Sequence, residues 1–172
     1  TVSSGVEDEA EPALALLAEY VTSSVTTLSS SAILGLGLAY IGTRKEAVLD
    51  TLLPILSDNT DTTSMDVLGL AALSVGLVML GSCHGETASS LVQLMMEKDE
   101  AILASSPFTR FLALSLGLLF LGKQEACEPV LETLKVVPTV VGKQAGILVM
   151  ALAYAGTSNV LKVQECLRAC QG

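Results

Sequence analysis

The chain has 172 residues, a length that suits one domain, and 51% of them are hydrophobic whereas only 16% are charged. Eighteen acidic residues against nine basic ones give a net charge of −9, which argues against nucleic acid and anionic membrane surfaces as partners, because both bind basic faces. The aromatic share of 3% argues against a stacking platform for bases or sugars, and the high apolar content excludes a disordered chain.

Four strongly apolar runs recur along the chain, over residues 32–42, 67–81, 111–122 and 145–156. The longest run has fifteen residues and is interrupted by serine and glycine. A membrane-spanning helix needs about 18 or more apolar residues. We therefore interpret the runs as buried helices of a protein core and expect no membrane partner.

The apolar runs contain an internal repeat. The segments LGLGLAYIGT, LSVGLVMLGS, LSLGLLFLGK and LVMALAYAGT begin at residues 34, 73, 114 and 148, and each carries a glycine near its end. These closing glycines, at positions 42, 81, 122 and 156, lie 39, 41 and 34 residues apart. Such spacing is typical of a repeat that consists of two helices joined by a turn.

In chain order, the pattern predicts a lone amphipathic helix followed by four helical pairs. The lone helix covers 12–22 and begins at Pro12, because proline suits the first helical position. Each pair joins one apolar run to an amphipathic second helix, and the second helices cover 44–57, 86–98, 124–136 and 158–170. Pro54 predicts a kink or an early end in its helix. Loops are expected at 57–63, 99–107 and 137–140, and the middle one is long enough to hold a short helix.

These elements divide a single repeat domain, 1–172, into five parts. Residues 1–28 hold the second helix of a truncated repeat, and whole repeats follow at 29–63, 64–106, 107–138 and 139–172. A column of small residues inside the first helices predicts close helix packing, since glycine in a helix is otherwise destabilising; its members are Gly37, Gly76, Gly117 and Ala151. The closing glycines suit the left-handed position that ends a helix.

The second helices carry acidic and polar residues at helical spacing. Glu46 and Asp50 are four residues apart; Glu86, Ser90, Gln93 and Glu97 step by 4, 3 and 4; and Glu125, Glu128 and Glu132 step by 3 and 4. From the residues alone, ordinary solvated helix faces explain these stripes best. The alternative hypothesis is an acidic ridge that complements a partner with a basic rim around an apolar patch.

No combination of residues indicates catalysis or metal binding. His84 is the one histidine, and adjacent residues such as Cys83 and His84 rarely face each other as a nucleophile pair requires. Cys166 and Cys170 lie too far along the chain from that pair for a structural zinc site, and the glycines at 35 and 37 do not follow a strand as a dinucleotide loop would. We expect no enzyme activity, no cofactor and no metal. Without a secretory signal, the four cysteines are expected to be reduced thiols of a cytoplasmic and nuclear protein.

The pattern G-x-G-L-A-Y-x-G-(S/T), complete at 35–43 and partial at 152–157, resembles the proteasome/cyclosome repeat. That repeat occurs in large scaffold subunits of the proteasome regulatory particle and of the anaphase-promoting complex. The resemblance implies an all-α fold, an α-solenoid of about four helix-turn-helix repeats that forms an arc of a toroid, with the first helices inside and the second helices outside.

The same resemblance implies a non-catalytic scaffold that docks ubiquitin, polyubiquitin and the ubiquitin-like domains of shuttle receptors, among the other subunits of the regulatory particle. By position, Glu86, Gln93 and Glu97 match acidic contact positions of the family's ubiquitin-binding surface, and Gln93 departs from them in being an amide. The stripes at Glu46 and Asp50 and at 125–132 are a geometric extension of that surface. The alternative is a purely architectural arc with no ligand site in this stretch.

Overall fold

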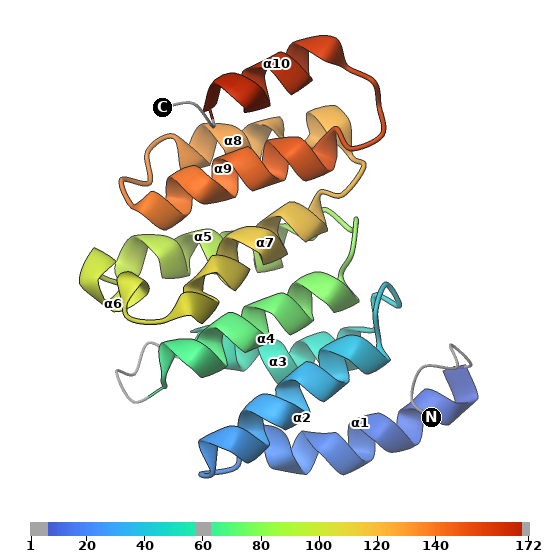
Figure 1. Ribbon diagram of the computed structural model, residues 1–172. Coiled ribbons are helices and arrows are strands. Elements are labelled where there is room, and N and C mark those ends of the chain that lie inside the picture. The colour runs from blue at the N-terminus through green and yellow to red at the C-terminus, as the bar shows by residue number, and fades with distance from the viewer. Residues whose placement is uncertain (1–6, 58–62, 170–172) are drawn as a thin grey trace.

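The computed structural model describes residues 7–57 and 63–169, with side chains from Pro12 onward, and it contains only helices and turns in them (Figure 1). The α-helices are α1 (Glu7–Val21), α2 (Thr26–Ala39), α3 (Glu46–Ser57), α4 (Met65–Val78), α5 (Gly85–Glu97), α6 (Glu100–Ala104), α7 (Arg110–Leu119), α8 (Glu128–Leu134), α9 (Val140–Ala153) and α10 (Val160–Ala169), and the 3-10 helices are η1 (Pro107–Thr109) and η2 (Gln124–Cys127). The expected all-α fold is confirmed. None of the described helices is long and apolar enough to cross a bilayer.

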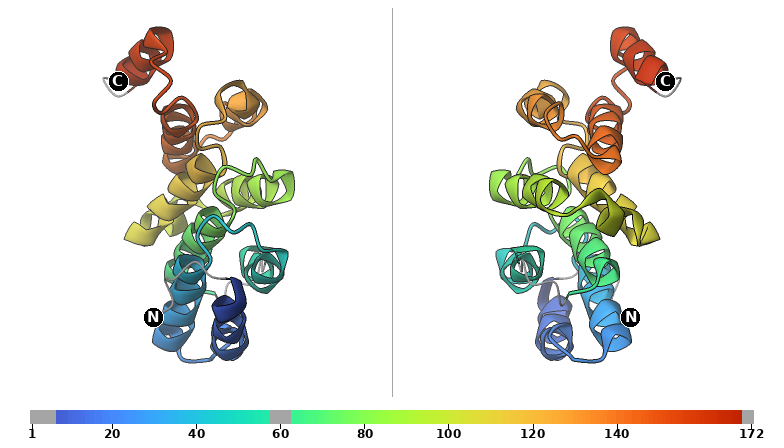
Figure 2. Two further views of the ribbon diagram at one scale, coloured as in Figure 1. Left: turned by 90° about the vertical axis from the view of Figure 1, so that its right-hand side faces the viewer. Right: turned by 90° about the vertical axis from the view of Figure 1, so that its left-hand side faces the viewer.

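The helices form two layers, which Figure 2 shows end-on. The apolar helices α2, α4, α7 and α9 stack in a first layer, and α1, α3, α5 and α8 stack beside them in a second layer. This arrangement is the expected solenoid of helical pairs, whereas closure into a toroid stays a prediction. The last helix, α10, departs from the second layer and lies over the end of the stack. No residue of α10 is buried, so core packing does not hold it in line with α8.

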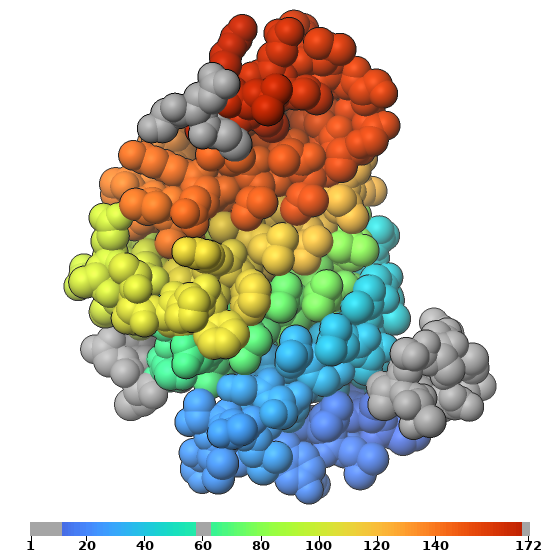
Figure 3. Space-filling view, in the orientation of Figure 1, coloured from blue at the N-terminus to red at the C-terminus, as the bar shows by residue number. Residues whose placement is uncertain are grey.

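Successive first-layer helices pack with their backbones in contact at the predicted glycine column. A Cβ atom on Gly37 would lie 2.6 Å from the Cα atom of Ser74, and one on Gly76 would lie 2.8 Å from the Cα atom of Ser115. The two serines also join the helices by hydrogen bonds: Ser74 Oγ donates to the Ile33 carbonyl at 2.9 Å, and Ser115 Oγ donates to the Ala72 carbonyl at 2.6 Å. In the space-filling view, which faces this layer, the helices form one continuous surface (Figure 3).

The closing glycines connect each pair to the next through the backbone. All four have positive φ angles, between 58° and 72°, as predicted for a left-handed helix end. The amides of Gly42, Gly81 and Gly122 donate at 2.9–3.0 Å to carbonyls in the last turn of the following first-layer helix, those of Leu77, Leu118 and Leu152. Two residues after Gly42 and Gly81, the amides of Arg44 and Cys83 make equivalent bonds to Val78 and Leu119. We call this pattern the turn clasp; it satisfies carbonyls that a helix end otherwise leaves unpaired.

Most differences between the predicted and the observed helix boundaries occur near prolines. Helix α1 begins at Glu7 and includes Pro12, because the glutamate- and alanine-rich residues before Pro12 favour a helix and acidic residues are stabilising at its positive end. Helix α3 continues past Pro54 to Ser57, so the early end is wrong. Leu52 and Leu56, on either side of the proline, are buried, and this packing offsets the hydrogen bond that proline cannot donate. The predicted loop at 57–63 lies largely outside the described residues.

The segment 124–136 is not the single helix that the periodicity predicts. Residues 124–127 form the 3-10 helix η2, and α8 starts anew at Glu128 with Pro129 in its first turn. Pro129 has no amide to continue an α-helix from η2, but it is well tolerated where a helix begins. The expected short helix within 99–107 is present as α6, followed by η1.

Replacing Gly76 by alanine tests the close packing of the first layer. We expect Gly76→Ala to lower the free energy of unfolding by about 2 kcal/mol, because the added methyl group would overlap the Ser115 backbone. Gly146→Ala is the matched control: nothing lies within 4 Å of a Cβ atom there, so this change should raise stability by up to about 1 kcal/mol. Urea unfolding measures both variants, and equal effects would contradict the packing argument.

Candidate functional site

A groove of about 570 Å³ separates the second-layer helices α5 and α8. Its lining is mainly apolar and includes Ala88, Val92 and Met96 from α5 and Pro129 and Val130 from α8. We call it the α5–α8 groove. It lies between the second helices of two adjacent repeats, where a partner that approaches the outside of the solenoid can reach it.

Met96 gives this groove an exposed apolar side chain. Helix α5 buries Ala88, Leu91 and Met95 against the rest of the protein, whereas Met96 is 53% exposed and contributes to the groove lining. Met96 is not among the site residues predicted from the sequence. The available signal was the helical spacing of Met96, which lies three residues after Gln93 and so shares the polar face of the helix.

The predicted polar ridge of α5 borders the groove. Gln93 and Glu97 line its edge, and Glu86 is exposed in the first turn of the helix. Gln93 Nε2 donates a hydrogen bond to Glu97 Oε1 at 2.6 Å. Ser90 is half-buried and donates from Oγ to the Glu86 carbonyl at 3.0 Å. Gln93 and Glu97 therefore lie at the groove, and their hydrogen bond orients the Glu97 carboxylate. The Ser90 hydroxyl instead bonds to the backbone of its own helix.

His84 fixes the start of α5. Its Nδ1 atom accepts a hydrogen bond from the Thr87 amide at 3.3 Å and lies 2.9 Å from Thr87 Oγ1, so the imidazole caps the helix as an N-cap side chain does. The preceding residue, Cys83, donates its amide to Leu119 in the turn clasp and lines the α5–α8 groove. These contacts position the groove and its ridge relative to the first layer.

The two other predicted stripes differ in their surroundings. Glu46 and Asp50 are both exposed on α3, one repeat before α5. Between α3 and α5 lies a small hollow of about 60 Å³, lined by Leu56 and by Ser90, Gln93 and Glu97 among others. Glu46 and Asp50 line neither this hollow nor the α5–α8 groove.

Glu125, Glu128 and Glu132 do not form one stripe of a helix. Glu125 belongs to η2, and Glu132 forms an exposed ion pair with Lys135 at 2.6 Å. Glu128 Oε1 accepts a hydrogen bond from Lys162 Nζ at 3.1 Å and another from the Tyr154 hydroxyl at 3.3 Å. The Glu128 carboxylate is therefore engaged with α10 and with the residue that follows α9.

The charges near α8 also change the titration of their neighbours. Burial raises the pKa of the Cys127 thiol above its ordinary value, and the nearby Glu128 carboxylate raises it further. The hydrogen bond to Glu128 raises the pKa of Lys162. Among the described residues, no three His, Cys, Asp or Glu side chains gather to hold a metal ion; Cys170 of the hypothetical zinc set lies outside those residues.

The acidic residues are distributed unevenly along the chain. Residues 1–122 contain fourteen of the eighteen acidic side chains and four of the nine basic ones. Residues 123–172 contain the other four acidic and five basic side chains. The α5 side of the groove thus belongs to the acidic part of the chain, and the α8 side belongs to a part whose charges nearly balance.

Comparison with known proteins shows matches over nearly the whole chain. Residues 31–65 match the family model described as the proteasome/cyclosome repeat. Over 98% of its length the chain is 47% identical to 26S proteasome non-ATPase regulatory subunit 2 of Dictyostelium discoideum, of which it covers 18%. It is 38% identical, again over 98% of its length, to 26S proteasome regulatory subunit rpn-1 of Neurospora crassa, of which it covers 19%. The chain spans about a fifth of the length of these relatives.

Cys127 predicts a loss of stability at alkaline pH. In the folded chain the pKa of this thiol is raised above its ordinary value of 9.0. As the pH rises, the unfolded chain therefore loses the thiol proton before the folded chain does. The stability that is fully present below pH 9 is then lost as the pH rises through the folded-state pKa. We expect the free energy of unfolding to fall by at most about 1.4 kcal/mol per pH unit from this one group above pH 9. In Cys127→Ala this part of the slope should disappear; an unchanged slope, measured by urea unfolding between pH 8 and 10, would refute the assignment.

Proposed function

We propose that this chain, which matches the proteasome/cyclosome repeat over residues 31–65, is a non-catalytic scaffold segment of a proteasome regulatory particle. We propose further that it docks ubiquitin chains and the ubiquitin-like domains of shuttle receptors. The observation that carries the proposal is the α5–α8 groove, an apolar hollow beside an acidic ridge on the second helices of adjacent repeats. Its other partners are the remaining subunits of that particle.

The names of the relatives support the scaffold part of this proposal. Both relatives at 98% coverage are named as regulatory subunits of the 26S proteasome, and one is named a non-ATPase subunit. The surroundings of the reactive side chains support a non-catalytic role: His84 caps α5, and Cys127 is buried directly before α8. A general base and a nucleophile would need to face each other in an accessible site.

The chemistry of the groove supports ubiquitin as the ligand. Ubiquitin and its mimics have an apolar patch with a basic rim, so their complement is an apolar hollow with carboxylates at its edge. Met96, Pro129 and Val130 supply apolar surface, while Glu86 and Glu97 supply charge. Gln93 occupies one oxygen of Glu97 and leaves the other for a cation. The amide at 93 therefore reduces the charge of the ridge but keeps its remaining carboxylate oriented.

A single site of this size implies modest affinity. One groove and its ridge offer less than about 1,200 Å² of total interface, which is the range of weak, transient complexes. Polyubiquitin would gain affinity when linked modules bind neighbouring surfaces, because linkage raises the effective concentration of the second module. Weak single contacts suit a receptor that has to release its cargo.

The architectural alternative rests on the turn clasp and the glycine column. These contacts join the repeats through backbone atoms and need no ligand to explain the recurring sequence pattern. Under this alternative, the polar ridge of α5 is an ordinary solvated helix face. The two functions differ in one measurable property, which is saturable binding of ubiquitin to the α5–α8 groove.

An NMR titration of the ¹⁵N-labelled chain with unlabelled monoubiquitin tests the proposal. We expect saturable shifts in residues 86–97 and 126–133, and we expect Glu86→Arg/Glu97→Arg to abolish them, because reversed charges repel the basic rim. The matched control is Glu19→Arg/Glu100→Arg, which makes the same change in net charge at exposed positions of α1 and α6. Met96→Ser should weaken binding roughly fivefold through lost apolar contact.

Two results would favour the architectural alternative. One is the absence of saturable shifts up to millimolar ubiquitin. The other is equal weakening by the ridge variant and by the Glu19/Glu100 control, because such a result would reflect net charge and not the groove. Retained helical circular dichroism in each variant ensures that a loss of shifts is not a loss of fold.

A further inference from the structure

Helix α8 stands between two hollows. On one side is the α5–α8 groove, into which Val130 and Thr133 project as lining residues. On the other side is a cleft of about 650 Å³ between α8, α9 and α10, lined by Leu131, Lys135 and Lys162 among others. We call the second hollow the α8–α10 cleft. Helix α8 therefore forms a wall of both hollows.

Core packing holds α8 weakly. Leu134 is the one residue of α8 that is buried, whereas α5 buries six of its thirteen residues. The helix has only seven residues and follows the 3-10 helix η2, so it receives no support from a continuous preceding helix. Because apolar burial supplies most of the energy that fixes a helix in place, other contacts have a large share in setting the position of α8.

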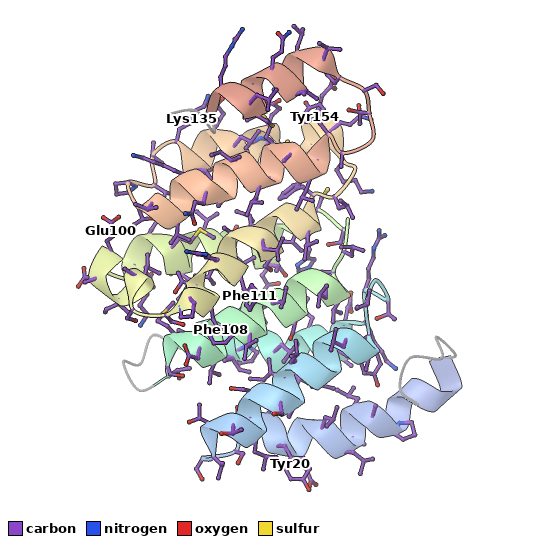
Figure 4. The ribbon with its side chains drawn as sticks, in the orientation of Figure 1. Tyr20, Glu100, Phe108, Phe111, Lys135 and Tyr154 are labelled. Atoms are coloured by element: carbon purple, nitrogen blue, oxygen red, sulfur yellow. The ribbon has the colours of Figure 1, made fainter. Side chains whose placement is uncertain are left out.

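Val130 and Leu131 of α8 are only partly buried against the core, and the polar contacts of the helix meet at Lys162. Its ammonium group lies 3.1 Å from Glu128 Oε1 and 3.4 Å from Glu165 Oε2, and 5.2 Å from the centre of the Tyr154 ring. The Tyr154 hydroxyl donates to the same Glu128 oxygen. Glu128 is the first residue of α8. Tyr154, which Figure 4 labels, directly follows α9 in the first layer. The cluster therefore ties the start of α8 to both α9 and α10.

We propose that Lys162 is a positioning residue for the docking groove: by holding Glu128 it fixes α8, the movable wall of the α5–α8 groove, from the opposite side of that helix. Lys162 does not line the groove and would not touch a ligand there. This inference rests on the proposed function, because it assigns a role in docking. Without the charge of Lys162, α8 moves more freely, and a ligand has to order the wall as it binds, which weakens its affinity.

The experiment compares Lys162→Met with Lys162→Arg and Lys143→Met. The arginine retains the charge and can still reach Glu128. Lys143→Met removes a positive charge from an exposed lysine that lines the α8–α10 cleft, so it matches the loss of net charge. Two quantities are measured in the 172-residue chain: the rate at which iodoacetamide alkylates Cys127, followed by peptide mass spectrometry, and the Kd of monoubiquitin, followed by NMR titration.

Cys127 reports the position of α8 without any ligand. It is buried and immediately precedes α8, so movement of the helix exposes its thiol. We expect Lys162→Met to raise its alkylation rate and to weaken ubiquitin binding, each by about two- to fivefold, the range that the loss of a partly exposed ion pair supports. Lys162→Arg and Lys143→Met should both stay close to the unmodified chain. Unchanged amide exchange in α4 would show that the effect is local and not global unfolding.

The outcomes separate this inference from the proposed function. Wild-type alkylation of Cys127 in Lys162→Met would overturn the inference, as would an unchanged Kd despite faster alkylation. Equal weakening by Lys143→Met would overturn it as well, because net charge would then be the cause. If the unmodified chain does not bind ubiquitin, the proposed function fails, while the alkylation rates still decide whether Lys162 holds α8.

Discussion

The close approach of the first-layer helices is the constraint on which the rest of the molecule depends. At Gly37 and Gly76 the backbone of the next helix occupies the space of a side chain, so neighbouring helices touch through main-chain atoms. Only at this separation can the turn amides of one repeat reach the terminal carbonyls of the next helix. The turn clasp and the glycine column therefore require each other, and together they fix the register of the stack.

The second layer follows from the first. Its helices carry larger side chains and have no equivalent glycine column, so gaps remain between them at the α5–α8 groove and the α8–α10 cleft. Adjacent repeats thus present a rigid first layer and a second layer with hollows. In such a molecule the scaffold and the candidate docking surface belong to different helices, which allows side chains in the groove to vary without loss of the stack.

Sequence patterns predicted those features that depend on local or strictly repeated contacts. The closing glycines were recognisable because all four end a helix in the left-handed conformation. The small-residue column was recognisable at Gly37, Gly76 and Gly117, which lie against the next helix, whereas its fourth predicted member, Ala151, is exposed because no first-layer helix follows α9 in the described residues. The boundaries near Pro12, Pro54 and Pro129 were predicted less well, since the effect of proline depends on its position within a turn and on the packing of the rest of the helix. The polar stripe at 125–132 failed as a helix face because η2 interrupts the periodicity on which it relied.

The sequence by itself determined the all-α repeat, its four apolar helices and the acidic character of α5, because periodicity and composition are properties of the chain alone. Tertiary structure decided which of the carboxylates stay open to a partner. Glu128 and Lys162 are 34 residues apart and pair only because α10 lies over the end of the stack, and Met96 becomes a groove residue only because α8 stands away from α5. Contacts between distant segments depend on where helices lie in space, and no local pattern in the sequence encodes that placement.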